Sequence, residues 1–116
     1  MALQIERVGD VVVLVPEGML TGGAETNELR ITLHRLVDEG QRKILLDLAK
    51  TTHITSTSFG ILASVHTSAA RHDLHFVICN VNERIRKVWT GVFVLLKPPF
   101  ELYDTRETAL QALATL

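Results

Sequence analysis

The sequence predicts a single α/β domain in which a mixed central sheet of about five strands is covered by about four helices. Three observations support this fold class. Short apolar runs rich in branched residues alternate with longer segments whose apolar residues recur at helical spacing. The chain has 116 residues, which suffice for one core and are too few for two. No repeat, linker or low-complexity segment divides it, so residues 1–116 are predicted to form one domain.

The N-terminal third predicts two strands and a helix. Residues 2–7 can form the first strand, and residues 9–10 (Gly-Asp) signal a turn. Residues 11–15 are continuously apolar, which favours a central strand covered on both faces. Between residues 29 and 37, apolar residues fall on one face of a helix, and Gly40 is a suitable end for it.

The rest of the chain alternates strands with helices. Strands are expected at residues 44–48, 75–79 and 100–103. A long helix is expected over residues 56–71, and Asn82 can cap a shorter one. A C-terminal helix is expected after a capping-box pattern, with Asp104 as the cap and Glu107 three residues later.

Composition excludes several classes of protein. The net charge is −1, from 12 basic and 13 acidic residues, and no basic stripe indicates a nucleic-acid partner. No apolar run is long enough for a membrane span and no signal peptide is evident, so we expect a cytoplasmic protein without direct membrane insertion. Cys79 is the single cysteine, which excludes an internal disulfide and is interpreted as core filler.

Metal, cofactor and catalytic sites are not expected. His66, His72 and His75 have a ligand-like spacing, but no cysteine or acidic pair completes a metal site. Neither a phosphate-binding loop nor a dinucleotide fingerprint occurs, so no cofactor is predicted. Ser58 could suggest the nucleophile of a hydrolase, but that motif needs glycine where Ser56 stands. The protein is therefore predicted not to be an enzyme.

Four consecutive hydroxyl residues, Thr55 to Ser58, stand where the long helix should begin, shortly after an apolar strand. Hydroxyl side chains cap helix N-termini, and Thr55 is the expected cap. A serine just inside the helix lies at the positive end of its dipole, where a phosphate would be stabilised. The pattern thus fits either an unmodified cap or a phosphorylation switch.

Five segments, in order, resemble motifs of the STAS domain, the fold of bacterial anti-sigma factor antagonists. They are residues 16–20 (like "eGeL"), 44–48 (like "vvlDls"), 54–62 (like "iDSsGlgvL"), 88–91 (like "L-x-x-tG") and 103–110 (like "vyds…eAl"). The resemblance covers nearly the whole chain and implies a STAS-like domain over residues 1–116.

The resemblance implies a function as well as a fold. Such antagonists bind a cytoplasmic serine kinase that doubles as an anti-sigma factor, and so release the sigma factor. The kinase reverses this by phosphorylating a hydroxyl at the start of the helix after the third strand. In this chain that position is Ser56, with Thr57 and Ser58 as alternative acceptors. The expected partner-binding residues are Thr21, Gly22, Gly23, Thr55, Ser56, Thr57 and Ser58.

The chain departs from the family pattern at this site. Thr55 replaces an acidic residue, and Ser58 replaces a glycine, which requires that its φ be negative. The connection from residue 91 to 103 is longer than usual, and its apolar residues 92–96 are expected to fill the core. STAS-like domains also serve as transporter subunits or as scaffold proteins in sensory assemblies. A module that docks without phosphorylation is therefore the alternative.

Overall fold

The computed structural model describes residues 3–71, 73–92 and 101–116, without the side chains of residues 69–70 and 88–92. The elements follow the predicted alternation of strands and helices. In order they are β1 (Leu3–Val8), β2 (Val11–Pro16), β3 (Gly18–Leu20), α1 (Ala24–Asp38), β4 (Lys43–Asp47), β5 (Thr51–Ile54), α2 (Ser56–Arg71), β6 (His75–Cys79), α3 (Glu83–Val92), β7 (Glu101–Tyr103) and α4 (Arg106–Ala114).

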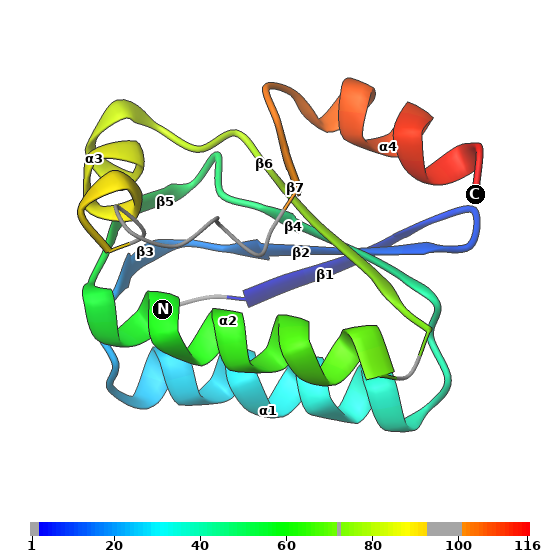
Figure 1. Cartoon of the computed structure of the whole chain (residues 1–116), viewed down its shortest axis with the longest axis horizontal. Helices are drawn as coiled ribbons and strands as arrows, with labels where there is room; N and C mark the ends of the chain where they lie inside the picture. The colour runs from blue at the N-terminus through cyan, green and yellow to red at the C-terminus, as the bar shows by residue number, and fades with distance from the viewer. Residues whose placement is uncertain (1–2, 72, 93–100) are drawn as a thin grey trace.

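The main sheet has five strands in the order β1-β2-β4-β6-β7. β1 pairs with β2 in antiparallel fashion, and the remaining neighbours are parallel. Helices α1 and α2 lie side by side on one face of this sheet, and α4 lies on the other (Figure 1). The mixed α/β fold predicted from the sequence is therefore confirmed.

The continuously apolar strand β2 is buried on both faces, as expected. Val12 and Leu14 belong to the larger core cluster under α1 and α2, whereas Val11, Val13 and Val15 face the smaller cluster under α4. This alternation follows from the period of two in a strand, and it explains why the run has no polar position. Alternate residues of one strand therefore pack against the two helical layers.

Two short strands were not predicted. β3 and β5 form a separate two-stranded parallel sheet beside α3 (Figure 1). The Gly18 N–H donates to the Lys50 carbonyl at 3.0 Å, and the Thr51 hydroxyl donates to the Pro16 carbonyl at 2.8 Å. Residues 51–54, for which no element was predicted, are thus a strand that leads directly into α2.

The predicted capping box of α4 is wrong by one residue. Thr105, not Asp104, is the N-cap, and its hydroxyl accepts from the Thr108 N–H at 3.2 Å. The Thr108 hydroxyl in turn accepts from the Thr105 N–H at 3.3 Å. Arg106 is the first helical residue of α4 and is paired with Asp47 of β4.

Some expectations fall outside the described residues. The apolar run 93–96 and the first residue of the expected strand 100–103 lie there, and so do the side chains of residues 88–92. In the described part of this strand, β7 starts at Glu101 and pairs with β6.

Candidate functional site

Helix α2 begins at Ser56, as the hydroxyl run predicted. The Thr55 hydroxyl accepts from the Ser58 N–H at 3.3 Å, so Thr55 is the cap expected from the sequence. The side chains of Ser56 and Thr57 are exposed, whereas Ser58 is fully buried. A partner or a modifying enzyme can reach the first two hydroxyls without any rearrangement of the fold.

The loop Thr21–Gly23 lies directly against this helix start. Gly22 has φ +91°, and a Cβ atom added there would lie 3.1 Å from Cγ2 of Thr57. Any other residue would be strained in its backbone and crowded against Thr57. The fold thus brings together the loop and the helix start that the sequence selected, although they are more than thirty residues apart. Glycine is what permits their close approach.

A series of hydrogen bonds, here called the relay, holds the loop Thr21–Gly23 against the start of α2. The Gly22 N–H donates to Thr26 Oγ1 at 2.9 Å, Thr26 Oγ1 lies 3.2 Å from Ser58 Oγ, and Ser58 Oγ donates to the Leu20 carbonyl at 2.9 Å. Thr55 Oγ1 also lies 3.1 Å from Ser58 Oγ. Because the Ser58 proton goes to a carbonyl, its oxygen accepts from the threonine hydroxyls. One buried hydroxyl therefore ties β3, α1 and α2 together.

Ser58 fits where the family pattern has glycine. Among the described non-glycine residues, only Asp73 and Asn80 have positive φ. The φ of Ser58 is therefore negative, as its replacement of a glycine requires. Its hydroxyl has no exposed surface and is committed to the Leu20 carbonyl. Phosphorylating it would require opening the relay, so Ser58 is the least suitable of the three predicted acceptors.

We expect Ser58→Ala to destabilise the protein by about 1–3 kcal/mol, because the buried Thr26 hydroxyl loses its acceptor. The Gly22 amide should also exchange its hydrogen faster, since the loop is held through Thr26. Urea unfolding and amide exchange measured by NMR test both effects. Thr26→Val, which removes the hydroxyl between Gly22 and Ser58, should have the same two effects, and Thr26→Ser, which keeps the hydroxyl, is its matched control. Unchanged Gly22 exchange in Ser58→Ala would show that the relay does not hold the loop.

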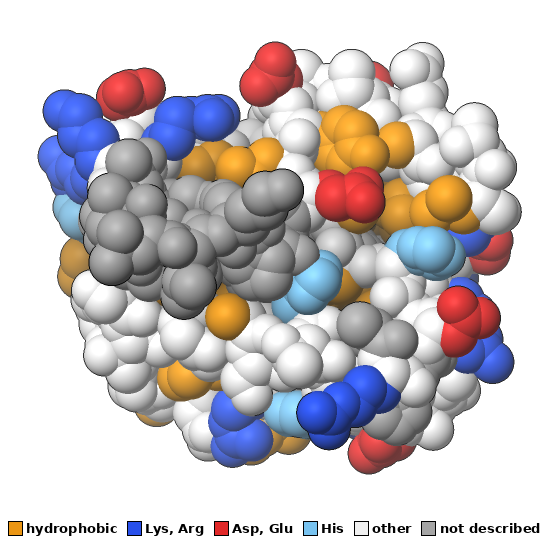
Figure 2. Space-filling view, in the orientation of Figure 1, with side chains coloured by type: hydrophobic (Ala, Val, Ile, Leu, Met, Phe, Trp, Pro, Cys, Tyr) orange, Lys and Arg blue, Asp and Glu red, His pale blue; other side chains and the backbone are white. Residues whose placement is uncertain are grey.

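Basic side chains surround α3, close to the small sheet. Arg84, Arg86 and Lys87 are exposed, and Figure 2 shows Lys and Arg side chains gathered over this helix. Arg84 donates to Nε2 of His53, and Nδ1 of that ring lies 3.1 Å from Thr52 Oγ1. The end of the molecule that bears Ser56 is therefore bordered by positive charge.

A buried carboxylate lies at the carboxyl end of β4. Asp47 Oδ1 accepts from the Ala49 N–H at 3.0 Å and from Asn80 Nδ2 at 2.9 Å, and Oδ2 accepts from Arg106 Nε at 2.8 Å. Burial raises the pKa of Asp47, but these hydrogen bonds outweigh it and hold the pKa below its usual value. Asp47 thus has one backbone donor and two side-chain donors.

Other candidate chemistry is limited in the described residues. Cys79 is buried, as expected, and burial together with the Asp47 carboxylate raises its pKa to about 12, so its thiol is not a nucleophile at neutral pH. Within residues 3–71, 73–92 and 101–116, no cluster of three or more His, Cys, Asp or Glu side chains has the geometry to hold a metal ion. In the same residues, no helix combines the length and apolar character needed to cross a bilayer.

The sequence profile of the STAS domain matches residues 2–109. The chain belongs to the STAS domain family. A relative from Bordetella bronchiseptica, BtrV, is named as a candidate anti-sigma factor antagonist. It is 23% identical to this STAS domain over 117 residues, which cover 99% of this chain and 97% of BtrV.

Solved structures of anti-sigma factor antagonists share the fold of this STAS domain. A candidate antagonist from Thermotoga maritima superposes with a TM-score of 0.81, at 23% identity over 97% of this chain and 94% of that one. The antagonist SpoIIAA in its unphosphorylated form gives 0.76, at 19% identity over 99% and 100% of the two chains. Its phosphorylated form, from Bacillus, gives 0.73, at 20% identity over 97% and 99%.

Sequence reasoning missed two residues that build this site. Thr26 was not selected, because its role depends on contact with Ser58, 32 positions away. Arg106 was assigned only to a capping pattern, although it pairs with Asp47 across 59 positions. Threonine and arginine are common near helix starts, so their presence in the sequence gave no signal for the contacts with Ser58 and Asp47.

Proposed function

We propose that this STAS domain is a non-enzymatic regulatory binding module that acts as an anti-sigma factor antagonist in the cytoplasm. Its partner would be an anti-sigma factor that is also a serine kinase. The observation that carries the proposal is the exposed Ser56 at the start of α2, beside the loop Thr21–Gly23. Together these two segments make a small neutral surface, suited to a partner that fits an unmodified hydroxyl.

The proposed switch is a phosphate on Ser56, with Thr57 as the alternative exposed acceptor. Phosphorylation adds a charge of roughly −1.5 to −2 and three acceptor oxygens. At the first residue of α2 the helix dipole would stabilise that charge, so the domain would stay folded. A partner surface fitted to a neutral hydroxyl would be repelled. The modification would thus act on binding and leave the fold intact.

The second candidate function is docking without phosphorylation, as a transporter subunit or as part of a sensory scaffold. One observation favours it: Thr55 stands where the family pattern has an acidic residue, and its hydroxyl is used as the helix cap. A kinase that needs the acidic residue would not modify Ser56. The surface would then bind its partner constitutively.

Phosphopeptide mapping of the protein from its native cells, under growth and under stress, tests the switch. A phosphate on Ser56 that changes with condition supports the antagonist. A phosphate on Thr57 keeps the switch and moves it by one residue. Absence of phosphate under every condition contradicts the switch and favours the docking module. Binding of the unmodified protein to an anti-sigma factor kinase distinguishes the two partner classes independently of the phosphate.

A further inference from the structure

Strand β1 forms one edge of the main sheet (Figure 1). It has six residues, Leu3–Val8, which pair with β2 in an unbroken register, and no strand among the described residues pairs with its outer side. Natural edge strands are usually shortened, bulged, interrupted by proline or lined with charge, because an open edge can pair with another chain. Of these features β1 has only the charges of Glu6 and Arg7, so its outer backbone groups can accept a further strand.

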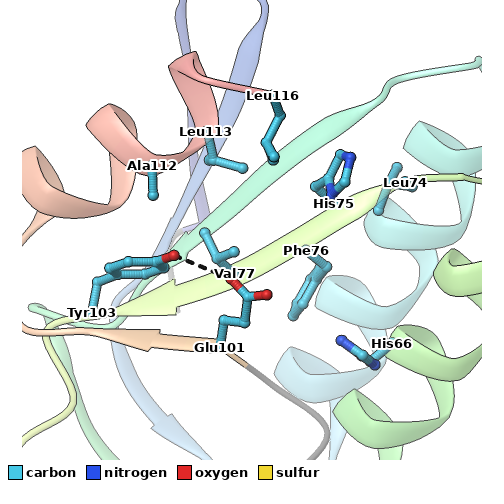
Figure 3. Close-up of a pocket in the computed structure, with 10 residues that line it drawn as sticks. All are labelled: His66, Leu74, His75, Phe76, Val77, Glu101, Tyr103, Ala112, Leu113 and Leu116. Carbon is cyan, nitrogen blue, oxygen red and sulfur yellow. Dashed lines mark hydrogen bonds between the residues drawn. The ribbon is translucent and has the colours of Figure 1, made fainter.

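The opposite edge of the sheet is protected. β7 has three residues, Glu101–Tyr103, and begins with a charged side chain. The Tyr103 hydroxyl donates to Glu101 at 3.1 Å, so the two outermost side chains of this short strand engage each other (Figure 3). A strand that is both short and charged is a poor template for pairing. We therefore expect any association through the main sheet to occur at β1.

The side chains of β1 offer three kinds of contact. Ile5 lies on the face covered by α1 and α2, yet its side chain is 50% exposed. On the other face, Gln4 Oε1 accepts from Lys50 Nζ at 3.3 Å. Glu6 Oε2 accepts from Arg106 Nη1 at 2.6 Å. The amide N–H groups of Gln4 and the second carboxylate oxygen of Glu6 have no partner among the described residues. β1 thus presents an apolar side chain, a donor and an acceptor.

We propose that β1 pairs with β1 of a second copy of this chain, antiparallel and with Ile5 at the two-fold axis. Such an axis runs perpendicular to the sheet, so the residue beside it lies opposite its own copy. The two Ile5 side chains would then meet, and Gln4 would lie opposite Glu6 of the second copy. The Gln4 amide would donate to the unpartnered Glu6 oxygen on both sides of the axis.

Charge disfavours the neighbouring registers. An axis at Glu6 would place two carboxylates opposite each other, and an axis at Arg7 would do the same with two guanidinium groups. Like charges directly opposite each other destabilise a sheet. An axis at Gln4 would pair only residues 3–5 of the two β1 strands with one another. The register about Ile5 pairs residues 3–7, buries the exposed isoleucine and brings no like charges together.

The proposed dimer is one continuous sheet. Helices α1 and α2 of both copies lie on the same face of it, and the short β7 strands form its two ends. The long open edge disappears, which is the physical benefit of the pairing. Because the contact rests on one strand and few side chains, we expect a weak dimer with a dissociation constant on the order of 0.1 mM. The proposal is independent of the regulatory function assigned to Ser56.

Disulfide formation between cysteine variants tests the register. In Ile5→Cys the two new thiols would face each other, with Cβ atoms about 4.5–5.5 Å apart, so mild oxidation should link much of the protein into dimers. Arg7→Cys, on the same face of β1, is the matched control. Its two thiols would be separated by about 14 Å along the strands, which is too far for a disulfide. Cys79 does not compete, because it is buried and its pKa is raised to about 12.

Sedimentation equilibrium measures the dimer itself. Ile5→Lys places two like charges beside the axis and should weaken dimerisation at least about tenfold. Ile31→Lys, at an isoleucine of α1 that is 52% exposed, is the matched control and should dimerise as the wild type does. Unfolding curves show whether each variant is folded. The proposal is wrong if the wild type is monomeric at millimolar concentration, if Ile5→Lys dimerises like the wild type, or if Arg7→Cys forms the disulfide as readily as Ile5→Cys.

Discussion

Ser56→Asp is expected to weaken binding of the anti-sigma factor partner by about 100-fold, whereas Ser56→Ala should stay within about threefold of the wild type. The aspartate places an unpaired charge on a surface fitted to a neutral hydroxyl, and a 100-fold loss corresponds to a cost of about 2.8 kcal/mol for desolvating and repelling that charge. Alanine removes a hydrogen bond at most. Equilibrium binding of the three proteins to the same purified partner measures the difference.

Stability separates this effect from misfolding. Ser56 is exposed at the first position of α2, where a negative charge interacts favourably with the helix dipole by about 0.3–1 kcal/mol. Ser56→Asp should therefore unfold at the same urea concentration as the wild type or at a higher one. Ser64→Asp, at another exposed position of α2, is the matched control and should bind normally. Equal binding by Ser56→Asp and Ser56→Ala would contradict the proposal that a negative charge at residue 56 weakens partner binding.

The sequence predicted that a helix begins at Ser56 and that Thr55 caps it, because local chemistry determines both. Apolar runs predict the buried strands. A hydroxyl side chain at the start of a helix can accept a hydrogen bond from a first-turn N–H group, and Thr55 does so here. The loop Thr21–Gly23 was placed beside this helix start by resemblance, and the contact of Gly22 with Thr57 gives the physical reason. These features depend on residues close in sequence or on glycine's backbone freedom.

What the sequence did not predict depends on long-range contacts. β3 (Gly-Met-Leu) and β5 (Thr-Thr-His-Ile) have three and four residues, which are too few to show the alternating pattern of a strand. Asp104 and Thr105 can both cap a helix, and in the structure Thr105 is the cap, with its hydroxyl bonded to the Thr108 N–H. Ser58 could be recognised from sequence as a departure from the family pattern. Its buried hydrogen bond with Thr26 could not, because the two residues are 32 positions apart.

Asp47→Ala is expected to lower the free energy of unfolding at pH 7 by about 2–4 kcal/mol. The change leaves Asn80 and Arg106 without the acceptor that joins β4 to β6 and α4. Arg106 keeps its contact with Glu6, at 2.6 Å, which limits the loss. Glu39→Ala, which removes an exposed carboxylate paired with the exposed Arg35, is the control and should change stability little. Urea unfolding at pH 7 measures both variants.

The effect of Asp47 should disappear in acid. Because its pKa is lower in the folded protein than in the unfolded chain, the carboxylate stabilises the fold above its ordinary pKa of 3.8, and this contribution is lost as the pH falls below that value. The wild type should therefore lose stability steeply below pH 3.8, and Asp47→Ala less steeply, so that their unfolding curves converge. A difference that stays constant from pH 7 to pH 3 would mean that Asp47 acts through packing and not through its charge. The salt bridge to Arg106 would then be incidental to how α4 is held on the sheet.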